Sequence, residues 1–196
     1  MDTGIIILSA GSSSRLGKPK QLLRYKGKYL LDIVTEAAIN TCFKPVLVIL
    51  GAYAAEIRNT VKQSDIWYAV NHQWEQGMSS SIVFGITEML AHYPNLENIV
   101  IAVSDQAFID SGLLERLLEK RRQSGKNIVA SEYKGTMGTP ALFNKKYFGK
   151  LMALKGDKGA KKIFELHPDD TDTVEFMLGH IDIDTEKDFY NLINRQ

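Results

Sequence analysis

The chain has 196 residues, of which 44% are hydrophobic and 24% are charged, so it carries enough apolar side chains for a packed core and lacks the composition of a disordered protein. This length predicts one domain, and no Pro/Gly/Ser-rich or single-sign stretch marks a linker, so we treat residues 1–196 as a single domain. The formal net charge of +1 excludes the whole-molecule attraction that is typical of proteins binding nucleic acids or anionic membranes.

Two further features predict a cytoplasmic protein without a membrane partner. The first three residues carry no basic segment of a signal peptide, and the apolar run at 5–8 is far shorter than the ~18 residues that span a bilayer. The single cysteine, Cys42, excludes an internal disulfide framework and any multi-cysteine metal site, and fits a reducing compartment. We expect Cys42 to be a small buried side chain on a helix.

Short apolar runs alternate with segments of helical spacing over roughly the first 130 residues. Runs bounded by turn residues indicate buried strands at 5–8, 46–50, 66–70, 99–103 and 128–130. Apolar residues at helical spacing indicate helices between them, over 30–41, 79–91 and 113–118. Strands that are apolar on both faces and are joined by helical crossovers predict a Rossmann-like three-layer α/β/α fold with a mostly parallel sheet.

The pattern changes after these strands. A turn-rich stretch covers 133–143, and a helical segment follows over 146–166. We then expect a short strand pair at 174–177 and 181–183, and a last helix near 186–193.

The loop after the first strand is the first candidate site, because ligands of open α/β sheets bind beyond the carboxyl ends of the strands. Residues 8–23 read LSAGSSSRLGKPKQLL. Their small side chains let backbone N–H groups wrap an anion, and Arg15 and Lys20 supply the cationic donors that phosphate oxygens favour. The loop therefore predicts a polyphosphate site; the alternative is a glycine/serine turn with solvated cations.

Two common phosphate-loop motifs do not match. A Walker loop needs four residues between its glycines and a Ser or Thr after its lysine, whereas Gly11 and Gly17 enclose five residues and Pro19 follows Lys18. The dinucleotide fingerprint has Ser13 where its second glycine should be. The loop favours neither an ordinary P-loop NTPase nor a dehydrogenase.

The stretch AGSSSRLGKPKQLL resembles the signature of the MobA-like nucleotidyltransferases, and most closely that of the molybdenum cofactor cytidylyltransferase (MocA-like) branch. Further matching motifs follow in the family's order: GMSSSI at 77–82, Asp105-Gln106, GTPALF at 138–143, GDKGAK at 156–161 and DIDT at 182–185. The resemblance covers essentially the full length.

Three positions depart from the family pattern. Ala107 replaces a proline after Asp105-Gln106, Thr139 stands where a histidine is common, and Glu186 stands where a proline is usual. These changes bear more on the acceptor than on the reaction class.

The resemblance implies a nucleotidyltransferase with Mg²⁺ as cofactor, which transfers CMP from CTP to the phosphate of a molybdopterin-type acceptor and releases pyrophosphate. CTP is favoured over GTP because Ser9-Ala10-Gly11 is closer to the Ala-Ala-Gly form of cytidylyl enzymes than to the Ala-Gly-Gly form of guanylyl enzymes. A molybdenum hydroxylase is the implied protein partner. The alternatives are a cytidylyl- or guanylyltransferase for another small phosphorylated acceptor, and a non-catalytic molybdenum cofactor-binding or insertion chaperone.

The resemblance also implies a role for individual residues. Arg15 and Lys20 are the implied catalytic residues. The implied nucleotide-binding residues are Ser9, Ala10, Gly11, Ser12, Arg15, Lys20, Gly77, Ser80 and Ser81. The implied acceptor-binding residues are Gly138, Lys158 and Lys161. Helix capping is an alternative of equal weight for Ser80 and for Ser81. For Lys158 and Lys161 the alternative is that both are solvated side chains at an exposed helix start.

The metal ligands are predicted to be two distant aspartates. Asp105 follows the strand at 99–103, which puts it at the same sheet edge as the loop. Mg²⁺ is usually held by one or two carboxylates together with phosphate oxygens, and Asp184 matches the family's late metal-binding aspartate. Asp182 competes with Asp184, because residues two apart on a strand share a face. Asp105 has an alternative role as a turn residue that caps the helix starting near Asp110. Asp184 has an alternative role as the N-cap of the last helix.

Overall fold

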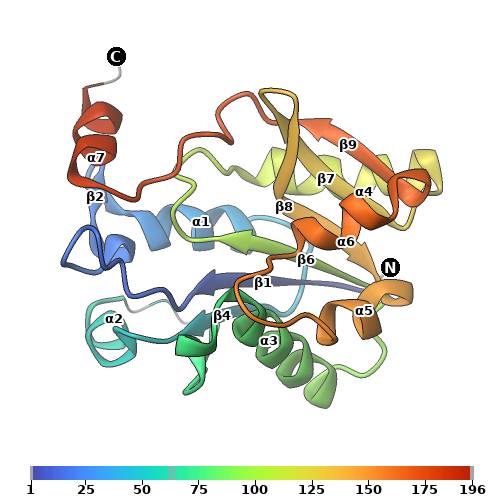
Figure 1. Ribbon diagram of the computed structural model, residues 1–196, viewed down its shortest axis with the longest axis horizontal. Helices are drawn as coiled ribbons and strands as arrows, with labels where there is room; N and C mark the ends of the chain where they lie inside the picture. Colours follow the sequence, from blue (N-terminus) through green and yellow to red (C-terminus); the bar gives the residue numbers. More distant parts are fainter. Residues whose placement is uncertain (1, 62, 64, 195–196) are drawn as a thin grey trace.

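The computed structural model describes residues 2–61, 63 and 65–194 (Figure 1). Its centre is a seven-stranded sheet in the order β5-β4-β1-β6-β8-β7-β9. The strands are β1 (Thr3–Ser9), β4 (Val46–Leu50), β5 (Trp67–Val70), β6 (Asn98–Val103), β7 (Ile128–Tyr133), β8 (Thr136–Asn144) and β9 (Thr171–Glu175). All neighbouring strands in this sheet are parallel except the two pairs that involve β8. The expected mostly parallel sheet is confirmed.

Helices cover both faces of the sheet, which confirms the three-layer α/β/α architecture (Figure 1). One face packs against α1 (Leu30–Ile39), α2 (Ala54–Thr60) and α4 (Ser111–Ser124). The other packs against α3 (Met78–His92), α5 (Phe148–Met152) and α6 (Lys161–Leu166). None of the helices in the described part of the chain is both long and apolar enough to cross a bilayer.

The side chains of β1 point alternately to the two faces of the sheet, which explains why its central residues are all apolar. Ile5 and Ile7 pack in the cluster under α1 and α4, whereas Ile6 and Leu8 pack in the cluster under α3. Successive side chains of a strand point to opposite faces, so a strand covered on both faces needs apolar residues at every position. The carboxyl ends of β1 and its parallel neighbours therefore meet at one edge, where polar residues begin.

A third apolar cluster closes this edge at one side. It joins the start of the chain to its end through a small hairpin, β2 (Arg24–Tyr25) and β3 (Lys28–Tyr29), and the last helix, α7 (Glu186–Ile193). Its buried members are Leu16, Leu23, Tyr25, Leu30, Ala107, Ile183 and Leu192. Four single-turn 3₁₀ helices complete the elements, at Lys20–Leu22, Trp74–Gln76, Lys145–Tyr147 and Pro168–Asp170.

The expectation of a turn-rich stretch at 133–143 is wrong. A two-residue turn follows β7, and β8 then pairs antiparallel with both β6 and β7. Gly138 and Pro140 are tolerated because the pairing with β7 shifts register between Ala130 and Ser131, opposite these residues. The bulge absorbs the residues that suggested a turn.

Other expectations for the second half were also wrong. The helical segment at 146–166 is broken between α5 and α6, where Gly156 has a positive φ of 67°. Residues 171–175 form β9 beside β7, but residues 181–183 do not form a strand.

The outcome for the first part of the chain is mixed. Cys42 is exposed in a bend after α1 rather than buried on a helix. The three long helices predicted within about the first 130 residues are confirmed by α1, α3 and α4, and the predicted last helix is confirmed by α7. The short elements α2 and the hairpin β2–β3 were not predicted.

Gly85 provides a test of how closely α3 packs on the sheet. A Cβ added to Gly85 would lie 3.0 Å from Ile6 Cγ2 and 3.2 Å from Ile49 Cγ1, so Gly85→Val must push the helix away from β1 and β4. We expect Gly85→Val to lower the free energy of unfolding by about 2 kcal/mol, as for other overpacked cores, in urea denaturation. Gly149→Val is the matched control, because a Cβ at Gly149 meets no atom within 4 Å. Equal stability of the two variants would contradict this packing.

Candidate active site

The loop between β1 and α1 is shaped by its own backbone and by one buried glutamine. Ser13, with a φ of 50°, accepts hydrogen bonds at its carbonyl from Leu16 N (2.9 Å) and Gly17 N (3.1 Å). Gln21 is only 1% exposed, and its Nε2 donates to the carbonyl of Ser9 at 3.0 Å. These hydrogen bonds fix the backbone of the loop above the edge of the sheet.

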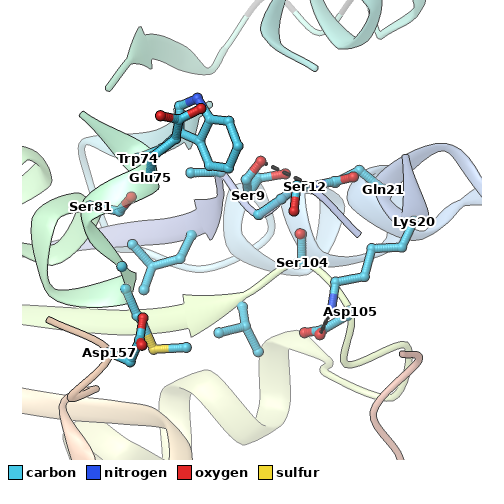
Figure 2. Close-up of a pocket in the computed structure, with 16 residues that line it drawn as sticks. Ser9, Ser12, Lys20, Gln21, Trp74, Glu75, Ser81, Ser104, Asp105 and Asp157 are labelled. Carbon is cyan, nitrogen blue, oxygen red and sulfur yellow. Dashed lines mark hydrogen bonds and ion pairs between the residues drawn. The ribbon is translucent and has the colours of Figure 1, made fainter. Parts of the chain in front are cut away.

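A cavity of about 410 Å³ lies between this loop, the end of β6 and the start of α3 (Figure 2). Eight of the predicted site residues line it: Ser9, Ala10, Gly11, Ser12, Lys20, Gly77, Ser81 and Asp105. A Cβ at Gly11 would meet no protein atom within 4 Å, so the space beside its backbone is open to a ligand. The prediction that the loop and Asp105 lie at the same edge of the sheet is confirmed.

Lys20 joins two acids that lie far apart in the sequence. Its Nζ is 2.5 Å from Asp105 Oδ2 and 3.1 Å from Asp184 Oδ1, and Figure 2 shows it directed at Asp105. Burial alone would lower the pKa of Lys20, but the charges of Asp105 and Asp184 and the hydrogen bonds to them leave that pKa above its ordinary value. Lys20 is therefore a permanent cation at the lip of the cavity.

Arg15 and Asp184 lie in a shallower hollow beside the cavity, which Lys20 also lines. Arg15 Nη1 is 3.8 Å from Asp184 Oδ2, and its side chain is 75% exposed. Lys18 Nζ is 3.3 Å from Glu186 Oε1 at the start of α7. Three basic residues of the loop thus face the acidic segment that leads into the last helix.

Neither aspartate is a helix cap, which was the competing interpretation. Asp110 caps α4 by accepting a hydrogen bond from Leu113 N at 2.7 Å, and Asp105 is free of that role. Thr185 caps α7 in a capping box with Asp188, so Asp184 is not the cap either. Both carboxylates instead contact Lys20.

Asp182 is a third carboxyl at this edge. Partial desolvation, followed by the negative charges of Asp105 and Asp184, raises the pKa of Asp182 to about 6, against the opposing influence of Lys20 and of a hydrogen bond with Gln106. Like charges close together disfavour the ionised form of one of them. The edge therefore carries more negative charge than Lys20 neutralises.

The start of α3 is locked to the segment before α6. Gly77 has a φ of 94°, and a Cβ on it would lie 2.4 Å from Asp157 Oδ1 and 2.7 Å from the carbonyl carbon of Gly156. Ser79 donates to the carbonyl of Gly156 from both its N (3.2 Å) and its Oγ (2.6 Å). Only glycine fits at position 77, because a side chain would meet both steric and conformational resistance.

The two predicted serines of α3 differ in their surroundings. Ser81 lines the cavity and accepts a hydrogen bond from Asn71 Nδ2 at 3.1 Å. Ser80 lines a separate hollow, accepts from the same amide at 3.0 Å and donates to the carbonyls of Gln73 and Gly77. The structure therefore separates Ser80 from the other predicted nucleotide residues.

Among the cavity residues that sequence reasoning did not select, three have aromatic or charged side chains. Trp74 and Glu75 lie above the cavity in Figure 2, and Asp157 lies on the opposite side. Trp74 and Glu75 lie just before the GMSSSI motif at 77–82, which includes neither of them. Asp157 reaches the cavity only because its loop packs on Gly77.

The predicted acceptor residues are only partly together. Gly138 and Lys161 line a second cavity of about 240 Å³, which shares its apolar floor of Leu8, Met78 and Val103 with the first. Lys158 is exposed and lies outside the lining of both cavities.

Inside the second cavity, both predicted residues are already in contact with protein groups. Lys161 Nζ contacts Thr136 Oγ1 at 3.0 Å. A Cβ at Gly138 would overlap the hydroxyl of Tyr133, so this glycine makes room for a tyrosine of the protein.

The chain matches a known protein family along most of its length. Residues 5–172 match the model of the MobA-like NTP transferase domain. The chain belongs to this family. It is 27% identical to nicotine blue oxidoreductase of Paenarthrobacter nicotinovorans, covering 96% of this chain and 95% of that protein. It is also 27% identical to the molybdenum cofactor biosynthesis bifunctional protein of a Synechocystis strain, over 65% of this chain and 33% of that protein.

Solved structures superpose closely on this chain. The crystal structure of Rv0371c from Mycobacterium tuberculosis has a TM-score of 0.87 and 26% identity, over 99% of this chain and 98% of that one. A crystal structure of Rv0371c in complex with manganese has a TM-score of 0.84 and 23% identity, over the full length of both chains. The nucleotidyltransferase fold is thus shared over essentially the whole chain.

Asp182 provides a test of the charge balance at this edge. Its folded pKa of about 6 lies above the ordinary 3.8, so its ionisation opposes folding, and the stability of the wild type falls as the pH rises through 6. We expect Asp182→Asn to be more stable than the wild type by about 1 kcal/mol at pH 7.5 in EDTA, after discounting the full shift for solvent exposure. The difference should shrink towards zero near pH 4.

Urea denaturation at both pH values measures this difference, and Asp169→Asn, which alters an exposed carboxylate outside the site, is the control. A pH-independent difference between Asp182→Asn and the wild type would show that the crowding of carboxylates is not its cause.

Proposed function

We propose that this protein transfers CMP from CTP to the terminal phosphate of a molybdopterin-type acceptor. An acceptor phosphate oxygen attacks the α-phosphorus of CTP, the bond from that phosphorus to the bridging oxygen of the β-phosphate breaks, and pyrophosphate leaves. A phosphate monoester is already largely ionised near neutral pH, so positioning and charge neutralisation are the main tasks of the protein.

The observation that carries this proposal is the position of Lys20. It lies where the glycine/serine loop, Asp105 and Asp184 meet, at one end of a cavity large enough for a nucleotide. We assign Lys20 to the α-phosphate and the exposed Arg15 to the leaving β- and γ-phosphates. Backbone groups of residues 9–12 line the same end and complete an anion cradle.

The residues at this end also fit a divalent cation. Asp105 and Asp184 already share one cation, the Lys20 ammonium, and oxygen ligands are what Mg²⁺ prefers. Within the described ranges, no three acidic, histidine or cysteine side chains form a ready-made metal site. That suits Mg²⁺, which commonly takes one or two carboxylates and completes its shell with phosphate oxygens and water. Bound there, the ion would neutralise charge on the triphosphate.

We assign Asp184 rather than Asp182 as the second ligand. Asp184 contacts both Lys20 and Arg15 and lines the same hollow as these two side chains and the loop after β1. The manganese complex of Rv0371c supports a divalent cation in a protein of this fold.

The opposite end of the cavity suits the nucleoside. The indole of Trp74 offers a flat apolar face, and base–aromatic stacking contributes roughly 1–3 kcal/mol where it has been measured in nucleic-acid binding. Ser81 adds a hydroxyl on the other wall. The preference for CTP rests on Ser9-Ala10-Gly11, which resembles the loop of cytidylyl enzymes.

We assign the acceptor to the second cavity, which adjoins the first. With the acceptor body against β8 and α6, its phosphate would reach towards Lys20 across the shared floor. Similarity to a molybdenum cofactor biosynthesis protein supports a molybdopterin acceptor and a molybdenum hydroxylase as the recipient of the product. Another small phosphorylated acceptor, or GTP as donor, remains within the same reaction class.

Similarity to nicotine blue oxidoreductase over nearly the whole of both chains favours a second candidate, an oxidoreductase on this fold. The loop after β1 has Ser13 in place of the second glycine of the dinucleotide fingerprint, which favours a triphosphate over a dinucleotide.

A substrate screen separates these functions. We expect pyrophosphate release to require the protein, Mg²⁺, extracted molybdopterin and CTP together, with GTP, ATP and UTP less effective. Release with another phosphorylated acceptor alone would correct the acceptor. Tight molybdopterin binding without pyrophosphate release from any triphosphate would indicate a chaperone, and turnover of nicotine blue with a nicotinamide cofactor would indicate the oxidoreductase.

Lys20→Met tests the assignment of the α-phosphate. The change keeps the length of the side chain and removes its charge, so it should act mainly on the transition state, where charge builds up around the α-phosphorus. We expect kcat to fall by about 10²–10³-fold while the Kd of CTP changes by less than about fivefold. Lys18→Met, on the same loop but paired with Glu186, should keep kcat within about twofold. Unchanged turnover of Lys20→Met would remove Lys20 from the reaction.

A further inference from the structure

Gln106 is a buried polar residue that the proposed reaction does not use. It follows Asp105 directly, at the end of β6, and only 2% of it is exposed. Burying a carboxamide is costly unless its polar atoms are paired, so its partners indicate what it is for.

Those partners come from two distant parts of the chain. Its Nε2 donates to the carbonyl of Gly179 at 2.9 Å. On the other side, Thr139 Oγ1 donates to its Oε1 at 3.4 Å. One side chain therefore links β6 to the segment that carries Asp182 and Asp184, and to the β7–β8 hairpin.

The segment at 176–185 has little else to hold it at this edge. It contains no strand or helix, and its backbone bonds are short-range turns apart from Phe176 N to the carbonyl of Glu132. Phe176 is buried in the cluster under α1 and α4 and Ile183 in the third cluster, and these contacts fix the depth of the segment. Apolar contacts do not fix the rotation of the carboxylates on either side of Ile183, whereas a directional hydrogen bond does.

The segment also carries charge that opposes its own placement. Lys20 contacts both Asp105 and Asp184, so these two carboxylates approach each other, and Asp182 adds a further acidic side chain to the same segment. Lys20 offsets the repulsion at Asp184. Gln106 is neutral and donates to the carbonyl of Gly179, so it can hold the segment near Asp105 without altering the net charge that a cation would meet.

We propose that Gln106 is a positioning residue that assembles the metal-binding carboxylates and ties them to the wall of the acceptor cavity. This inference rests on the proposed function in that it takes Asp105 and Asp184 as the metal ligands. The tie through Thr139, which lines the second cavity, links the geometry of the acceptor wall to that of the carboxylates.

The test measures Mn²⁺ binding by electron paramagnetic resonance at saturating CTP. Gln106→Met keeps the size of the side chain and removes all its hydrogen bonds, and we expect the Kd of Mn²⁺ to rise by about tenfold, as for residues that orient metal ligands elsewhere. The matched control is Gln21→Met, an equally buried carboxamide that holds the nucleotide loop. It should weaken CTP binding but leave Mn²⁺ binding at saturating CTP within about twofold of the wild type.

A second readout is independent of metal and nucleotide. Hydrogen exchange of the amides at 176–185 should be severalfold faster in Gln106→Met than in the wild type, with the amides of β1 unchanged. If Gln106→Met does not fold, Gln106→Asn keeps the amide but is one methylene too short to reach Gly179, and should show the same changes at smaller amplitude.

The outcomes separate the two proposals. Wild-type Mn²⁺ affinity and wild-type exchange at 176–185 in a folded Gln106→Met would overturn the role of Gln106. Equal losses of Mn²⁺ affinity in Gln106→Met and Gln21→Met would overturn it as well, because they would indicate general loosening. Failure of the wild type to bind Mn²⁺ with any nucleoside triphosphate would contradict the proposed function, and the exchange measurement would still decide the role of Gln106.

Discussion

The shared contact of Lys20 with Asp105 and Asp184 is the interaction on which the site depends. The three residues come from the first loop, the end of β6 and the segment before α7, so this one ammonium joins the beginning, the middle and the end of the chain. Without a cation between them the carboxylates would repel one another and stay more solvated. The lysine therefore stabilises an arrangement that is electrostatically unfavourable on its own and that suits a ligand rich in phosphate.

The sheet supplies the frame for that contact. Parallel strands end at one edge, and the order β4-β1-β6 puts the ends of β1 and β6 side by side, so Ser9 and Asp105 meet regardless of their separation in sequence. The one antiparallel strand, β8, extends the frame in a different way. Because β8 starts at this edge rather than ending there, the turn that precedes it and the residues around Gly138 form a wall beside the cavity.

Much of this arrangement could be predicted from local pattern alone. The strands β1, β4 and β6 are runs of buried aliphatic residues, and the rule that ligands bind at their carboxyl ends was enough to bring the glycine/serine loop and Asp105 together. β8 was missed because Gly138 and Pro140 are locally turn-forming, and only the pairing with two neighbouring strands and the bulge in β8 opposite Ala130 and Ser131 make them acceptable in a strand. Tertiary pairing overrode local preference there.

The residues of the site that were missed have a common cause. Asp157 and Gln106 lie in motifs that resemble the family, but no role was predicted for either, and Trp74 lies in no motif. Asp157 and Gln106 gain their places from contacts with segments remote in sequence, such as Asp157 from its loop packing on Gly77. Ser80 shows the converse, because it sits in a recognisable motif yet its hydroxyl is bound by backbone carbonyls outside the cavity. Sequence motifs identify which segments converge, whereas the direction of each side chain depends on packing that a single sequence does not reveal.

The two adjoining cavities divide the candidate site into two sets of contacts. They share an apolar floor, with Lys20 and Asp105 lining the first cavity, whereas the second is bounded by β8 and α6. Substitutions in the second cavity can change what is bound there while Lys20, Asp105 and the loop stay in place, because the floor separates the two sets of contacts. In this chain the departures at Ala107 and Thr139 lie around Gln106 rather than in the loop after β1, so they fall where the second cavity meets the segment that carries Asp105.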